Sequence, residues 1–134
     1  MVWLLVLICC FCLLFFMPSS CPLDAIPLHQ TLRDGNTIVS SNGQFELGFF
    51  NFSSRRYLGI WYKSMAKGTI IWVANRNTPL NNSLGTVKLT TQGNLLLLNS
   101  SNIPIWASYN DTTKTARNPV AQLLGTGNLV IREA

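Results

Sequence analysis

Few residues in this chain could perform acid–base or nucleophilic chemistry. His29 has no serine, cysteine or acidic residue grouped with it, and Glu46 alternates with phenylalanines without a second carboxylate at a useful spacing. The chain contains no glycine-rich phosphate loop and no kinase motif, and no zinc or redox spacing of cysteines follows the N-terminal segment. We therefore expect no enzymatic activity, no catalytic residue, no cofactor and no bound metal.

Two asparagines in an internal repeat are the candidates for binding chemistry. Asn94 and Asn128 each follow a glycine, precede an apolar run and lie 34 residues apart. Trp72 and Trp106 show the same offset of 34, so two elements share one period and form a repeat. Amide side chains can bind a ligand, but Gly-Asn before an apolar strand is also good turn chemistry. We favour the turn.

Asn-x-Ser/Thr triplets predict acceptors for N-linked glycans in a secreted protein. All of them fall in stretches that we interpret as loops, and we expect two or more to be occupied. The four acceptor residues are Asn51, Asn81, Asn99 and Asn110.

The segments between these residues have the composition of short strands. Phe45, Leu47 and Phe49 alternate with polar or small residues, a period of two that is typical of a half-buried strand. Short strands separated by Gly, Pro and Asn turns favour an all-β domain, and no helical periodicity follows the N-terminal segment.

Three hairpin-like units are expected to pack around a pseudo-threefold axis. The first and most diverged unit spans residues 57–74, with Leu58 in the place of Asn94 at an offset of 36. None of the units could bury its apolar face alone. We expect the core to include the tryptophans Trp61, Trp72 and Trp106.

The third unit is expected to be incomplete. A tryptophan equivalent to Trp106 would fall at position 140, whereas the sequence ends at Ala134. The resulting open sheet edge predicts pairing with a partner strand or self-association.

The N-terminal segment has the layout of a secretory signal peptide. An apolar run from Val2 to Phe16 is followed by Pro18 and small residues, which predicts a signal helix in residues 1–21 and a mature domain in residues 22–134. The alternative is an uncleaved membrane anchor, which would need about 20 apolar residues.

The net charge of +5 lies on the mature domain. Its basic residues are dispersed, with Arg55 and Arg56 the one adjacent pair, so we expect a solvated surface and no nucleic-acid partner. Three of the four cysteines lie in the apolar run, so the mature domain must be held together by packing rather than by disulfides.

Several motifs in order carry a family resemblance over nearly all of the mature chain. The motifs are Gly43–Phe50, Tyr57–Tyr62, Trp72–Arg76 and Gly127–Val130. With these motifs in this order, the chain resembles the bulb-type lectin domain of plant S-locus glycoproteins and G-type lectin receptor-like kinases. The resemblance implies a β-prism II fold of three four-stranded sheets and an extracellular protein.

The resemblance also implies a sugar site. In the monocot mannose-binding members, each repeat carries Gln-x-Asp-x-Asn-x-Val-x-Tyr on one face of a strand. This chain keeps little of that pattern and lacks the Asp in all three repeats. The candidate positions are Thr90, Gln92 and Asn94 in the second repeat, Asn128 and Val130 in the third, and Tyr62 in the first.

We call the five positions of this pattern on one strand face the strip. The loss of its Asp determines whether the strip can still bind a sugar. A sugar site with a Kd of about 1 mM has only about 4 kcal/mol of binding free energy. A hydrogen bond to a charged group contributes about 1.5 to 3 kcal/mol. We therefore expect monocot-type mannose binding to be absent.

The leading hypothesis is a secreted, non-catalytic, lectin-like recognition module in the apoplast, which binds a protein or glycan ligand outside the cell. One alternative is an active mannose-binding defence lectin. Another is a non-functional receptor fragment. A membrane location is expected only if the N-terminal helix is not cleaved.

Overall fold

The computed structural model describes residues 23–64, 69–108 and 116–134, which form short antiparallel strands. The expected signal peptide at residues 1–21 lies outside the described residues. Within them, no helix has the length and apolar character needed to cross a membrane. The strands are β1 (Ala25–Pro27), β2 (Thr31–Arg33), β3 (Ile38–Val39), β4 (Phe45–Phe52), β5 (Arg55–Tyr62), β6 (Ile70–Val73), β7 (Thr86–Leu89), β8 (Leu95–Leu98), β9 (Pro104–Ala107), β10 (Pro119–Leu123) and β11 (Leu129–Glu133).

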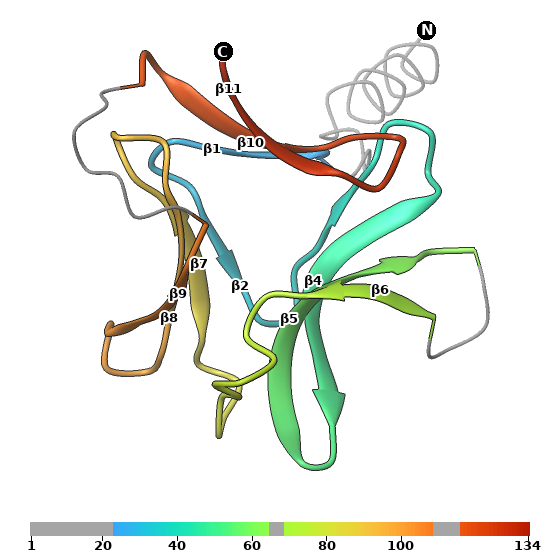
Figure 1. Cartoon of the computed structure of the whole chain (residues 1–134), viewed down its shortest axis with the longest axis vertical. Helices are drawn as coiled ribbons and strands as arrows, with labels where there is room; N and C mark the ends of the chain where they lie inside the picture. Colours follow the sequence, from blue (N-terminus) through green and yellow to red (C-terminus); the bar gives the residue numbers. More distant parts are fainter. Residues whose placement is uncertain (1–22, 65–68, 109–115) are drawn as a thin grey trace, which may run out of the picture.

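Three antiparallel sheets surround a common axis (Figure 1), which confirms the expected all-β architecture. Their strand orders are β3-β4-β5-β6, β2-β7-β8-β9 and β1-β10-β11. The third sheet has three strands among the described residues, whereas the other two have four. The sequence therefore predicted the number of sheets.

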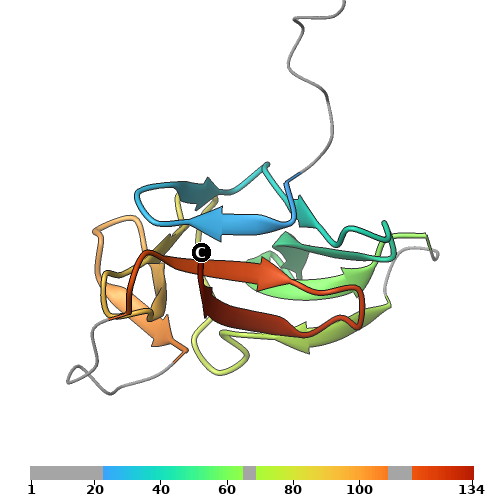
Figure 2. The same ribbon diagram turned by 90° about the horizontal axis from the view of Figure 1, so that it is seen from above.

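The N-terminal strands connect the three sheets. β1 pairs with β10, β2 pairs with β7 and β3 pairs with β4, so one short stretch of chain contributes one strand to each sheet. Figure 2 shows β1 lying along the β10–β11 pair. The sequence analysis did not detect β1 or β2, because strands of three residues carry too little periodicity to be recognised.

Each sheet turns one face toward the axis, where the inward side chains form a single apolar core. Leu58, Leu95 and Leu123 come from three different sheets, and each has no exposed surface. Complete burial of such a side chain stabilises the fold by about 1.5 to 3 kcal/mol relative to exposure. The core therefore depends on the side chains that β5, β8 and β10 turn inward.

Two of the three expected core tryptophans are partly buried and pack against the core. Trp72 on β6 and Trp106 on β9 pack edge to face against each other, with ring centroids 5.6 Å apart, and both contact the core. The expectation for Trp61 was wrong. Trp61 faces away from the core because it lies one residue after the inward-facing Ile60, and its Nε1 donates a hydrogen bond of 2.9 Å to Glu46 Oε1.

Asn75 fastens the end of β6 to β5. Its side chain is 1% exposed, and its Oδ1 accepts a hydrogen bond of 2.9 Å from the Leu58 N–H. Its Nδ2 donates to the carbonyl oxygens of Thr78 and Arg56, at 3.1 and 3.4 Å. One buried amide thus satisfies three backbone groups where the chain leaves the sheet.

We predict that Asn75→Ala lowers the free energy of unfolding by about 2 to 3 kcal/mol, because it leaves buried backbone groups without partners. Urea denaturation of the wild type and the variant measures this. Asn77→Ala, at an exposed asparagine two residues away, is the matched control and should change stability by no more than about 0.5 kcal/mol. Equal effects of the two substitutions would contradict the role assigned to Asn75.

Candidate functional site

The register of two hairpins defines which residues of the first and second repeats are equivalent. Ile60 lies opposite Trp72, and Leu97 lies opposite Trp106. The tryptophans are 34 residues apart, whereas Ile60 and Leu97 are 37 apart, because the β5–β6 connection is three residues longer than the β8–β9 connection. Both hairpins shift register directly after this position, which supports the equivalence.

The sequence-based alignment of the first repeat was therefore wrong by one residue. At an offset of 37, Tyr57 rather than Leu58 corresponds to Asn94. A one-residue change of register moves every side chain to the opposite face. Tyr62 accordingly lies on the inward face, where its ring packs 4.9 Å from that of Phe45, and it belongs to no outward strip.

In the second repeat, the polar candidates mostly build a turn. Gly93, at a φ of +84°, donates its N–H to the Thr90 carbonyl, and the Asn94 N–H donates to Thr90 Oγ1 at 3.0 Å. Asn94 itself is 7% exposed, and Gln92 is exposed in the turn. Leu96 is the next outward residue. This supports the turn interpretation and leaves little polar chemistry on the strand.

The third repeat keeps the most of the expected strip. Asn128 is exposed, and its Nδ2 donates a hydrogen bond of 3.1 Å to Thr126 Oγ1. Val130 lies on the same face of β11 and pairs across the sheet with Gln122 of β10. Two of the five groups in the mannose pattern are therefore present here, beside an amide from a neighbouring strand.

A polar row that the sequence analysis missed crosses the outward face of this third sheet. Arg132 Nε donates to Gln122 Oε1 at 2.6 Å, and Gln122 Nε2 donates to Asp24 Oδ2 at 3.0 Å. Asp24 and Gln122 are 98 residues apart in the sequence, so no local pattern could have joined them. These side chains are already paired with one another, and a sugar would have to displace those bonds.

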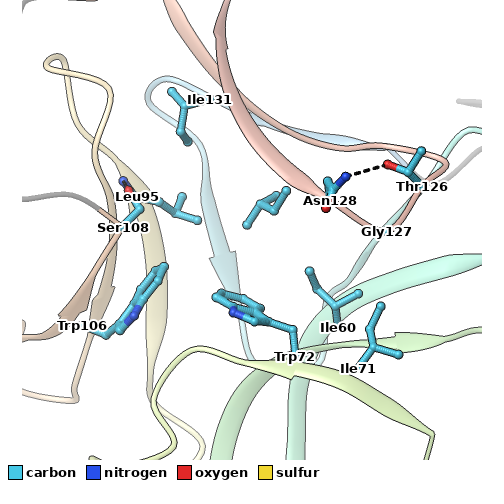
Figure 3. A pocket seen from close by; sticks show the side chains of 11 residues that line it. Ile60, Ile71, Trp72, Leu95, Trp106, Ser108, Thr126, Gly127, Asn128 and Ile131 are labelled. Carbon is cyan, nitrogen blue, oxygen red and sulfur yellow. Dashed lines mark hydrogen bonds between the residues drawn. The ribbon is translucent and has the colours of Figure 1, made fainter.

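A pocket near these residues lies on the axis of the sheets. Figure 3 shows the rings of Trp72 and Trp106 facing it from β6 and β9, with Asn128 and Ile131 on the β11 side. The pocket has a volume of about 500 Å³ and is lined mainly by apolar side chains. Sugar binding needs convergent polar groups. This pocket offers few of them.

Of the expected glycosylation sites, Asn51 and Asn81 are exposed and Asn99 is partly buried. Asn51 is exposed but belongs to β4, so its assignment to a loop was wrong, because β4 extends to Phe52. Asn81 and Asn99 lie outside the strands, and Asn110 lies outside the described residues. Their occupancy stays a prediction.

In the described part of the chain, no group of three or more His, Cys, Asp or Glu side chains is placed to hold a metal ion. His29 is exposed in a turn at a φ of +70°.

Comparison with known proteins places these features in context. The family model described as D-mannose binding lectin matches residues 69–134. A receptor-like serine/threonine-protein kinase of Arabidopsis thaliana is 50% identical over 107 residues, which cover 78% of this chain and 12% of the kinase. An S-locus-specific glycoprotein of Brassica oleracea is 44% identical over 129 residues, covering 92% of this chain and 29% of the glycoprotein.

Among solved structures, the mannose-specific agglutinin from snowdrop bulbs, complexed with methyl-α-D-mannoside, has a similar fold. The TM-score is 0.55 at 24% identity, and the match covers 83% of this chain and 90% of the agglutinin. This likeness shows the fold alone, and it agrees with the expected β-prism II architecture. This chain spans only 12% and 29% of the lengths of the kinase and the glycoprotein.

The revised register predicts that Leu58→Ala lowers the free energy of unfolding by about 2 to 5 kcal/mol, because it opens a cavity in the core. Leu96→Ala is the matched control. It makes the same truncation on an outward, partly exposed position of the equivalent strand, so it should cost about 1 kcal/mol or less. Chemical denaturation of both variants measures the difference. A larger loss for Leu96→Ala would contradict the register.

Proposed function

The chain carries a bulb-type lectin domain of the kind found in plant S-locus glycoproteins and G-type lectin S-receptor-like kinases, and we propose that it is a secreted, non-catalytic recognition module without mannose binding. Its ligand is a protein or a glycan outside the cell. The kinase relatives match this chain only over their lectin part, so their catalytic activity is not carried over.

The outward faces of the sheets support the loss of mannose binding. In the sheet of β4 and β5, the position of the strip's asparagine holds Tyr57. In the sheet of β7 and β8, Asn94 is buried and is followed on its face by Leu96. The mannose pattern has an Asp between its Gln and its Asn. None of the three strips has an Asp or Glu at that position among the described residues.

The third sheet carries the proposal most directly, because it is the best preserved. It offers Asn128 and Val130, but the position of the strip's tyrosine holds Arg132, which is bonded to Gln122. A neutral hydrogen bond contributes about 0.5 to 1.5 kcal/mol net, whereas even a Kd of about 1 mM requires about 4 kcal/mol. The remaining groups are too few for a specific site of that kind.

We predict no saturable binding of methyl-α-D-mannoside at concentrations up to about 10 mM, because the polar groups that remain supply too little binding free energy. Isothermal titration calorimetry of the wild type and of Asn128→Ala measures this, with the snowdrop agglutinin as the positive control. Binding that Asn128→Ala or Asn94→Ala weakens would contradict the proposal and favour an active mannose-binding lectin.

The extracellular location is supported by the relatives of this chain and by the exposure of its glycan acceptor residues. S-locus glycoproteins and the ectodomains of receptor kinases are the proteins that this chain resembles. Two of the acceptor asparagines, Asn51 and Asn81, lie at exposed positions, as glycosylation in the secretory pathway requires. A signal peptide in residues 1–21 would direct the chain there, and an uncleaved N-terminal helix would instead anchor it to a membrane.

A second copy of the chain is a further candidate partner. Among the described residues, β11 pairs with β10 on one side only, so its other edge presents unpaired backbone groups. The backbone groups of alternate residues point away from the neighbouring strand. The Ala134 N–H donates to the Asn118 carbonyl, so it points toward the β10 side of the strand pair. The N–H of Glu133, one residue earlier, therefore points to the free edge.

We predict a concentration-dependent increase in mass for the wild type in sedimentation equilibrium. Glu133→Pro removes the N–H on the free edge and should weaken association by about tenfold. Glu133→Thr keeps the N–H and removes the same carboxylate, so it should associate as the wild type does. A monomeric wild type, or equal association of the two variants, would contradict pairing through β11.

A further inference from the structure

The outward face of the sheet that contains β4 and β5 carries a cluster of aromatic rings. Phe50 stacks on Tyr57 with ring centroids 5.6 Å apart, and it meets Trp61 edge to face at 6.4 Å. Gly48 and Gly59 lie opposite each other beneath these rings. A Cβ on Gly59 would come within 2.7 Å of the Phe50 ring, so the glycines make the space that the rings occupy.

A small apolar pocket opens beside this cluster at the end of the β4–β5 hairpin. Its volume is about 250 Å³. Phe52, which is 67% exposed, forms its outer wall. The residues that line the pocket are Phe50, Phe52, Tyr57, Ile70, Val73 and Arg76.

One cation lies in this apolar wall without a counter-charge. Arg76 is exposed and makes no hydrogen bond or ion pair with the residues that the structure describes. Arg55, the cross-strand neighbour of Phe52, adds a positive charge at the same end of the hairpin, and its Nη1 donates a hydrogen bond of 2.7 Å to Asn81 Oδ1. Glu46 lies at the opposite end of β4, about 20 Å away along the strand, and its carboxylate oxygens accept hydrogen bonds from Trp61 and Thr37.

The pocket depends on a feature that the second repeat lacks. The turn from β4 to β5 is three residues longer than the turn from β7 to β8, counted between the equivalent pairs Phe49–Leu58 and Leu89–Leu95. The longer hairpin extends the sheet and places Phe52 beyond the core. The described part of the β8 face offers Leu96 and no aromatic ring.

The size and polarity of the pocket favour one kind of occupant. Pockets for small molecules usually measure about 300 to 1,000 Å³ and combine a mainly apolar lining with a small number of placed polar groups. This one is smaller and nearly all apolar, so the hydroxyl groups of a sugar would lose their hydrogen bonds to water without replacement. Aromatic and arginine side chains around a small apolar recess are instead typical of the centres of protein–protein interfaces.

We propose that this aromatic pocket binds a segment of another protein that presents a Leu, Ile or Phe side chain next to an Asp or Glu. The apolar side chain enters between Phe52, Tyr57 and Val73, and the carboxylate pairs with Arg76. The net charge of +5 favours an acidic partner over a basic one. The inference deepens the proposed recognition function, on which it rests, by naming the surface and the chemistry of the ligand.

A displayed library of random heptapeptides, selected on the immobilised wild-type protein, provides the probe. We expect the enriched peptides to carry Leu, Ile or Phe within two residues of Asp or Glu. Fluorescence anisotropy with the enriched peptides should then show affinity reduced at least about tenfold by Phe52→Ser and by Arg76→Glu, the loss expected for interface anchors. Leu84→Ser alters an apolar side chain that is 65% exposed outside the pocket, so it should leave the affinity within about twofold of the wild type.

Circular dichroism melts should coincide for the wild type and all three variants, because the substituted residues are exposed. Peptides that lack the acidic and apolar pair, or that bind Arg76→Glu as well as the wild type, would overturn the pocket while leaving a recognition function in place. Loss of binding to an immobilised glycan in Phe52→Ser and Arg76→Glu, without any selected peptide, would show a sugar site instead. A wild-type protein that captures neither peptides nor glycans would overturn both proposals.

Discussion

Burial of one face of each sheet against a common axis is the interaction on which this structure depends. Leu58, Leu95 and Leu123 contribute from three different sheets and are fully buried there. Because a strand alternates its side chains, a sheet that keeps its inward set can exchange its outward set at little cost to the fold. The outward faces are therefore free to lose one chemistry and gain another.

The three outward faces of this chain have diverged in this way. One carries aromatic rings over a pair of glycines, one is largely aliphatic, and the third carries the linked row of Asp24, Gln122 and Arg132. The insertions in the first repeat fall in its two connections, so they lengthen loops without disturbing the inward residues. The alternation of side chains along each strand therefore explains both why the outward faces differ and why the three sheets keep one fold.

The features that could be predicted from the sequence were those with a local signature. Alternation along residues 45–49 and the shared offset of Trp72 and Trp106 were enough to indicate hairpins around an axis. The register of the first repeat could not be found, because a longer loop and a bulge separate its strand from the tryptophan that sets the period. That error placed Tyr62 on the wrong face.

Other features depend on contacts between distant parts of the chain. The short strands β1 and β2 exist through pairing with β10 and β7 and have no pattern of their own. The same holds for Asp24 and Gln122, which form one row only after the sheets assemble.

Leu58 faces the shared core of this fold, while Tyr57 and Trp61 face outward. Nuclear Overhauser spectroscopy on protein labelled at leucine methyl and aromatic positions distinguishes this register from one shifted by a residue. We expect a network of cross-peaks that connects the methyl groups of Leu58, Leu95 and Leu123 to the core. Cross-peaks from the Tyr57 ring to this network, with Leu58 outside it, would show that the register is wrong.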